Sequence, residues 1–114
     1  MTQEKRRSER VPMLGQLNGE VMVFQPMLVR DISRGGVTVE TGFPLQIDSL
    51  HDIRLTLGGK SVVVKGRVVH SHISDVDQDI VVYRTGLEFV ELSAPVRSAI
   101  AEFIETVKVN RSGV

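Results

Sequence analysis

Two short polar stretches of the chain carry residue types that bind nucleotides. Residues 6–10 have arginine at both ends, and residues 31–36 have the form Asp-x-Ser-x-x-Gly. A guanidinium donates paired hydrogen bonds to phosphate oxygens or to the O6 and N7 atoms of guanine. A carboxylate can accept from the two donors on the Watson–Crick edge of guanine, N1–H and N2–H. Together the stretches predict a site for a guanine nucleotide.

The spacing of the two arginines is compatible with ligand binding, but each stretch also has a plainer interpretation, which the sequence leaves open. Two arginines four positions apart lie about 13 Å from each other in an extended segment, at about 3.3 Å per residue. They lie about 5–6 Å apart in a helical turn, and either spacing can clasp two phosphates. A basic run near a terminus is equally compatible with a solvated tail. Residues 31–36 are compatible with an ordinary turn, because Asp and Ser side chains bond to local backbone N–H groups.

Composition narrows the class of protein. The chain has 114 residues, 41% of them hydrophobic, which suits one domain with a real core. Its 14 basic and 14 acidic residues balance, so we expect no binding to long nucleic acid. The chain has no cysteine, no apolar run of about 20 residues and no apolar segment after its charged start. We therefore expect a cytoplasmic protein without a membrane span.

Short β-like runs separated by turn residues dominate the chain from residue 11. Asn18-Gly19 predicts a two-residue hairpin turn between strands 13–17 and 20–24. Further strands are expected at 27–32, 37–40, 53–57, 61–72 and 80–90, with a turn at Gly58-Gly59 and an acidic loop at 75–79. In the strand 61–72, alternation places His70 on the same face as Val64 and Val68.

One helix is predicted at the end of the chain. Ser93 is a candidate N-cap, and Pro95 falls in the first turn, where it is tolerated. An apolar stripe at helical spacing follows, formed by Val96, Ile100, Phe103, Ile104 and Val107. The pattern favours an all-β antiparallel barrel or sandwich with a C-terminal helix. We divide the chain into a flexible basic arm (1–10), this domain (11–107) and a frayed tail (108–114).

Metal binding and catalysis have little support. His70 and His72 point the same way on a strand, and Asp75, Asp77 and Asp79 follow. An EF-hand loop starting at Asp75 would need Gly and Glu at its sixth and twelfth positions, where this chain has isoleucine and glycine. No nucleophile elbow, zinc-protease motif, phosphate-binding Walker loop or cysteine nucleophile is present. We predict no metal site, no catalytic residue and no enzymatic activity.

The ordered set of motifs resembles the PilZ family of bacterial cyclic di-GMP receptors. The family pattern of two arginines four apart, followed by [D/N]-x-S-x-x-G, matches Arg6 and Arg10, then Asp31, Ser33 and Gly36. The run 66–69 (Gly-Arg-Val-Val) is similar to the family's Gly-x-Val segment. The run 83–89 is similar to its late Gly-[Val/Leu/Ile]-x-Phe strand, so the resemblance covers about residues 5–107.

This resemblance implies a six-stranded antiparallel β-barrel with a C-terminal helix, a PilZ-like split barrel. It also implies cyclic di-GMP as ligand, no cofactor, and a conformational change that signals to a partner protein not identified by the sequence. The implied ligand-binding residues come from both stretches and are Lys5, Arg6, Arg10, Asp31, Ser33, Gly35 and Gly36. Lys5 precedes the arginine motif, where a basic residue helps to hold a second, stacked cyclic di-GMP molecule.

One position departs from the family pattern. Many members carry an aromatic residue, often Trp, after the Gly-x-Val segment, whereas this chain has His70 and no Trp. His70 is a candidate base contact with less stacking area, or simply a strand histidine. Two other functions remain as alternatives: a ligand-independent adaptor of the same fold, and an OB-like barrel for single-stranded nucleic acid. The nucleic-acid alternative has less support, because such barrels stack bases on exposed aromatic residues along a basic groove, and this chain has few aromatic residues and no net charge.

Overall fold

The computed structural model of the chain describes residues 9–13, 17–21 and 25–112. Lys5 and Arg6 therefore lie outside the described residues. The elements are β1 (Val11–Pro12), β2 (Asn18–Val21), β3 (Gln25–Ile32), β4 (Gly36–Thr41), β5 (Leu50–Leu57), β6 (Lys60–Asp77), β7 (Ile80–Val90) and α2 (Ala94–Ser112).

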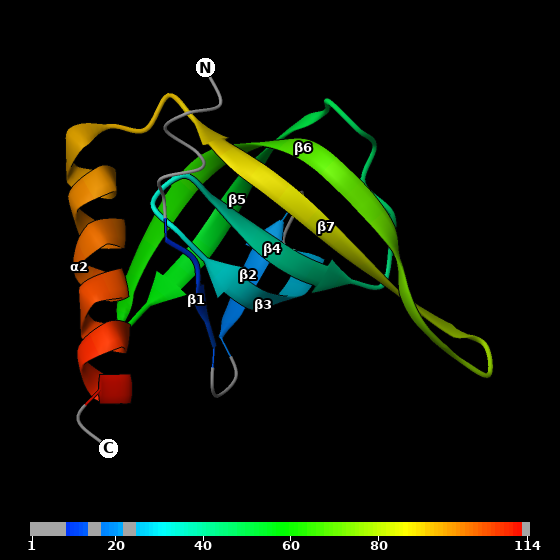
Figure 1. Cartoon of the computed structure of the whole chain (residues 1–114). Coiled ribbons are helices and arrows are strands. Elements are labelled where there is room, and N and C mark those ends of the chain that lie inside the picture. Colours follow the sequence, from blue (N-terminus) through cyan, green and yellow to red (C-terminus); the bar gives the residue numbers. More distant parts are fainter. Residues whose placement is uncertain (1–8, 14–16, 22–24, 113–114) are drawn as a thin grey trace.

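The strands pair antiparallel around a closed circuit. The circuit runs β3–β2–β5–β6–β7–β4 and returns to β3, because β3 pairs with β4 as well as with β2. The short strand β1 pairs with the end of β3, beyond the stretch that β2 covers. This arrangement confirms the prediction of a six-stranded antiparallel barrel with a C-terminal helix (Figure 1).

The barrel core is built from alternating side chains. In β5, Ile53, Leu55 and Leu57 are buried while the residues between them are exposed, which is the period of two that a strand with one wet face requires. Val64 and Val68 continue the core from β6. The inward side chains fill the barrel and leave the outward ones available for a surface site.

The helix α2 lies along one side of the barrel (Figure 1). It begins as predicted, because the Ser93 hydroxyl accepts a hydrogen bond from the Val96 backbone N–H at 3.4 Å. Ile100 and Ile104 of the predicted stripe are buried against the core. The prediction of a frayed tail from residue 108 is wrong as far as Ser112. The helix continues to Ser112, and Lys108 Nζ lies 2.8 Å from a Glu9 carboxylate oxygen.

The predicted turn at Asn18-Gly19 is wrong. Both residues belong to β2, which pairs with β3 on one side and with β5 on the other. A Cβ atom on Gly19 would lie 2.9 Å from the Arg54 carbonyl oxygen, so glycine here allows close approach of two strands. The same residue type that suggests a tight turn thus serves strand packing.

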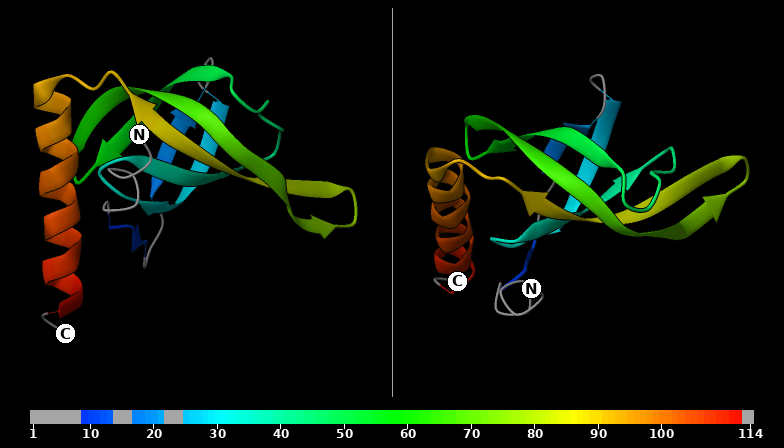
Figure 2. Two further views of the ribbon diagram at one scale, coloured as in Figure 1. Left: turned by 45° about the horizontal axis from the view of Figure 1, so that its top comes forward. Right: turned by 90° about the horizontal axis from the view of Figure 1, so that it is seen from above.

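The predicted acidic loop at 75–79 is also wrong. Asp75 and Asp77 lie in β6 and pair with Val82 and Ile80 of β7, and a short turn after them contains Gln78 with a φ of 58°. The Gly58-Gly59 turn, by contrast, is confirmed, with φ values of 57° and 92°. Figure 2 shows that the β6–β7 hairpin extends beyond the barrel, at the end away from α2.

We predict that Ile100→Ala lowers the free energy of unfolding by about 2–5 kcal/mol, since it removes buried methyl groups that α2 packs into the core and leaves a cavity. Urea denaturation monitored by circular dichroism measures the change. Val109→Ala is the matched control on the same helix, because Val109 is exposed, and it should change stability by less than about 0.5 kcal/mol. Equal effects of both substitutions would contradict the observed docking of the helix.

Candidate functional site

The two polar stretches meet at the end of β3. Arg10 Nη1 lies 3.0 Å from Asp31 Oδ1, and the two side chains are 35% and 29% exposed. Strand pairing brings them together, because Val11 and Pro12 of β1 lie opposite Ile32 and Asp31 of β3. A guanidinium has five N–H donors and a carboxylate has two oxygens, so this single contact leaves both groups able to bind a ligand as well.

A turn held by Ser33 follows Asp31. The Ser33 hydroxyl accepts hydrogen bonds from the backbone N–H groups of Gly35 (3.1 Å) and Gly36 (3.2 Å). The Ser33 backbone N–H donates to the Gly36 carbonyl oxygen at 2.8 Å. Ser33 is 2% exposed, so its hydroxyl is engaged inside the turn. Its contact with a ligand stays a prediction, as does that of Gly35, which is half-buried in the same turn.

Gly36 sits where three groups crowd together. A Cβ atom there would lie 2.3 Å from the Leu87 carbonyl oxygen, 3.3 Å from Arg10 Nη2 and 3.3 Å from Glu88 Cα. Real Cβ atoms do not approach backbone oxygen this closely, so only glycine lets β4 pair with β7 at this point. The same lack of a side chain lets the Arg10 guanidinium lie against the turn.

His70 lies on the outer surface, and the prediction that it shares a face with the buried Val64 and Val68 is wrong. A register shift between Val68 and His70 breaks the alternation, so His70 pairs with Gly86 of β7. The imidazole covers Gly86, since a Cβ atom there would lie 2.1 Å from His70 Nε2.

Cross-strand pairing aligns His70 with the Asp31 bend. Asp31 pairs with Thr38, Thr38 pairs with Gly86, and Gly86 pairs with His70. These residues form one row across β3, β4, β7 and β6. The sequence analysis did not name Thr38 as part of this surface. Its polar side chain between the buried residues Val37 and Val39 indicates an outward-facing position. The row brings the candidate base contact onto the same face of the barrel as the carboxylate.

Charged pairs flank this row on both sides. Arg67 and Glu88 form a close ion pair, and the hydrogen bond to Glu88 raises the pKa of Arg67 further above its usual value. On the other side Arg84 donates to Glu40 Oε2 at 2.6 and 3.1 Å, and Arg30 Nε lies 3.8 Å from the same oxygen. Sequence reasoning assigned no role to Glu40, Arg84 or Arg30. Their carboxylate and guanidinium groups make the surface around the row strongly polar.

Residues within the two motifs also contact α2. Lys108 Nζ lies 2.8 Å from Glu9 Oε1, and the pKa of Lys108 is raised mainly by this hydrogen bond. Arg34 Nη2 lies 3.7 Å from Glu105 Oε2. Glu9 and Arg34 occupy variable positions of the motifs, so motif spacing gave no signal for these contacts. The helix is thus joined to both stretches of the candidate site.

The family of the chain follows from comparison with known domains. The family model "PilZ domain" matches residues 4–106. The chain belongs to the PilZ domain family. The matched range includes both polar stretches and most of α2, so the fold and the motifs agree.

Solved structures share this fold. The PilZ domain of YcgR from Escherichia coli, determined with c-di-GMP, has a TM-score of 0.76 at 16% identity, over 94% of each chain. The MrkH–c-di-GMP complex from K. pneumonia has a TM-score of 0.75 at 17% identity, over 94% of this chain and 54% of the other. Bacillus subtilis MotI/DgrA, an inhibitor of motility, has a TM-score of 0.74 at 18% identity, over 93% of this chain and 52% of the other.

The present chain spans about half the length of the MrkH and MotI/DgrA chains. At these identities the likeness establishes the shared fold. No curated protein matches the chain with significance.

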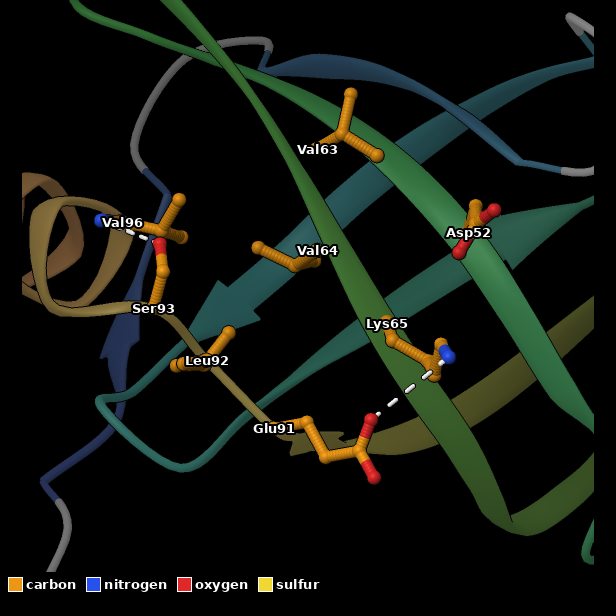
Figure 3. Close-up of a pocket in the computed structure, with 8 residues that line it drawn as sticks. All are labelled: Asp52, Val63, Val64, Lys65, Glu91, Leu92, Ser93 and Val96. Carbon is orange, nitrogen blue, oxygen red and sulfur yellow. Dashed lines mark hydrogen bonds and ion pairs between the residues drawn. The ribbon is translucent and has the colours of Figure 1, made fainter.

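A separate hollow of this PilZ domain lies near the start of α2 (Figure 3). It has a volume of 280 Å³, and Lys65 Nζ lies 3.8 Å from Glu91 Oε1 at its edge. The lining residues come from β5, β6, the connection to α2 and the first turn of α2: Asp52, Val63, Val64, Lys65, Glu91, Leu92, Ser93 and Val96. They include neither Arg10 nor Asp31, so this hollow is distinct from the surface where the motifs meet.

The described part of this PilZ domain shows neither a metal-binding cluster nor a membrane-spanning helix. Within it, no group of three or more His, Cys, Asp or Glu side chains is arranged to hold a metal ion. His70 and His72 stack with ring centroids 6.3 Å apart. Among the described helices, none is long and apolar enough to cross a membrane.

We predict that Ser33→Ala lowers the free energy of unfolding by about 1–3 kcal/mol, because it leaves the buried Gly36 N–H without its acceptor. Chemical denaturation measures the change. Ser98→Ala on the exposed surface of α2 is the control and should have little effect. A neutral Ser33→Ala would show that the turn does not depend on the hydroxyl.

Proposed function

We propose that this PilZ domain is a receptor for cyclic di-GMP and has no catalytic role. The observation that carries the proposal is the contact between Arg10 and Asp31, which joins the two polar stretches into one surface. The PilZ domain of YcgR and the MrkH complex, both determined with c-di-GMP, support the choice of ligand. The proposed setting is the bacterial cytoplasm.

Each part of the site has a distinct role in this proposal. Arg6 and Arg10 donate to phosphate oxygens and to the acceptor edge of guanine. The Asp31 carboxylate accepts from guanine N1–H and N2–H. Ser33 contacts ligand oxygen as well as holding the turn, and Gly35 and Gly36 let the nucleotide come close to backbone.

Two further residues extend the site. His70 is the proposed base contact, since cross-strand pairing places it in the row that contains Asp31. Its imidazole offers a smaller stacking surface than an indole would. Lys5 is proposed to bind a phosphate of a second cyclic di-GMP molecule stacked on the first.

Signalling is proposed to start with the arm, residues 1–10. Ligand charge draws the arm over the nucleotide, and the folded arm presents a new surface to a downstream protein. Ordering backbone costs about 1–2 kcal/mol per residue, which charge-assisted hydrogen bonds must offset. The pair formed by Glu9 and Lys108 supports this route, because it ties the arm to α2.

We predict that Arg10→Ala and Arg6→Ala each weaken cyclic di-GMP binding by at least about tenfold, since a hydrogen bond to a charged group contributes about 1.5–3 kcal/mol. Asp31→Asn should weaken it too, because an amide offers one acceptor where the carboxylate offers two. Isothermal titration calorimetry measures the affinities, with GTP and an oligonucleotide as competing ligands.

Arg7→Ala is the matched control, since it removes the same charge from a variable position of the motif. Affinity unchanged in both the Arg6 and Arg10 variants would falsify the ligand assignment. No binding of cyclic di-GMP by the unaltered chain would favour the ligand-independent adaptor. Tighter binding of the oligonucleotide would favour the nucleic-acid barrel.

We predict a stoichiometry of two cyclic di-GMP molecules per chain. Lys5→Ala should reduce it toward one, because the second molecule loses its proposed phosphate contact. The inflection point of the same calorimetric titration gives the number directly. One molecule per unaltered chain would reject the stacked pair while leaving the receptor proposal intact.

A further inference from the structure

The far end of the β6–β7 hairpin is an unusual surface for a small domain. It stands clear of the barrel, at the end opposite α2 (Figure 2). Ile73, Val76 and Ile80 are 56%, 58% and 66% exposed. Three large apolar side chains this exposed on one projecting element indicate a contact surface.

The two faces of the hairpin differ in chemistry. Ile73 pairs with Tyr83 and Val76 pairs with Val81, so these four side chains form one apolar face. The register shift between Ile73 and Asp75 sends Asp75 and Asp77 to the opposite face. On that face they follow His70 and His72, whose side chains are also exposed.

One edge of the hairpin is open to another strand. β5 pairs with β6 only as far as Arg67, and the backbone of Val68 bonds to the loop at Asp48 and Ser49. In the part of the chain that the structure describes, β7 is the one strand that pairs with β6 from residue 70 to residue 77. An edge with a neighbouring strand on one side alone is a template for strand addition, and the bulge between Ile73 and Asp75 lies in the middle of this one.

The side chains along this edge are complementary to themselves. Charged residues on an edge strand usually prevent pairing, because like charges meet. Here antiparallel pairing of two copies, with the axis between Ile73 and Ser74, sets His72 against Asp75 and His70 against Asp77. Imidazole N–H donors and carboxylate acceptors match in either protonation state of the histidine. The same register brings the Ile73 side chains of both copies to the axis.

We propose that β6 residues 70–77 pair antiparallel with the same residues of a second copy, forming a two-fold symmetric dimer through the hairpin. The apolar faces of the two hairpins then continue into each other, which covers Ile73 and Val76. The interface leaves α2, Arg10 and Asp31 outside the contact but includes His70, the proposed base contact. A closed isologous contact of this kind stops at two chains.

Sedimentation velocity of the whole chain, from micromolar to near-millimolar concentration, tests the proposal. The expected mass rises with concentration from 12.6 kDa to twice that value. Asp75→His/Asp77→His makes the edge all histidine, and His70→Asp/His72→Asp makes it all aspartate. The all-aspartate variant alone should remain monomeric, because carboxylates now face each other, whereas its equimolar mixture with the all-histidine variant should regain the doubled mass.

Asp79→His is the matched control, since it makes the same change outside the paired residues and should dimerise like the unaltered chain. Hydrogen exchange of the unaltered chain adds a measurement that needs no variant: protection of 70–77 should rise with concentration. The proposal would be overturned by any of three results: an unaltered chain that stays monomeric, a His70→Asp/His72→Asp variant that dimerises as well as the original, or unchanged protection of 70–77.

Discussion

The pairing of β1 with the end of β3 is the constraint on which the candidate site depends. The Arg10–Asp31 ion pair is partly exposed, and such pairs contribute at most about 1 kcal/mol, so it cannot position the chain by itself. Val11 is fully buried, and burial of a valine contributes about 1.5–3 kcal/mol. Apolar packing next to the motif therefore determines where the guanidinium lies, and the charges make use of that position.

Much of the fold could be predicted from patterning. The alternation of apolar and polar residues in β5 and the apolar stripe of α2 indicate which face of each element packs against the core. Both patterns appear directly in the sequence. The errors arose where a local signal has two physical causes. Gly19 permits close approach of strands and so resembles a turn residue, while Asp75 and Asp77 resemble a loop although they project from a strand.

The site could be predicted less completely than the fold. Motif spacing identified Arg10 and Asp31, whose contact is a finding of the structure. The outward position of His70 depends on a register shift after Val68, and no sequence rule locates such a shift from a single chain. The contacts of Glu9 and Arg34 with α2 depend on where the helix docks, which is a tertiary property that local spacing does not encode.

The crowding around Gly36 separates two kinds of residue within the two motifs. Gly36 and Ser33 serve the architecture, because one permits two strands to touch and the other closes the bend. Arg10 and Asp31 lie at the surface, and the barrel closes without them. Substitution of the charged residues should therefore remove the proposed ligand contacts and spare the scaffold, whereas substitution of Gly36 or Ser33 should disturb both. The proposed ligand contacts can thus be removed by a single substitution without unfolding the domain.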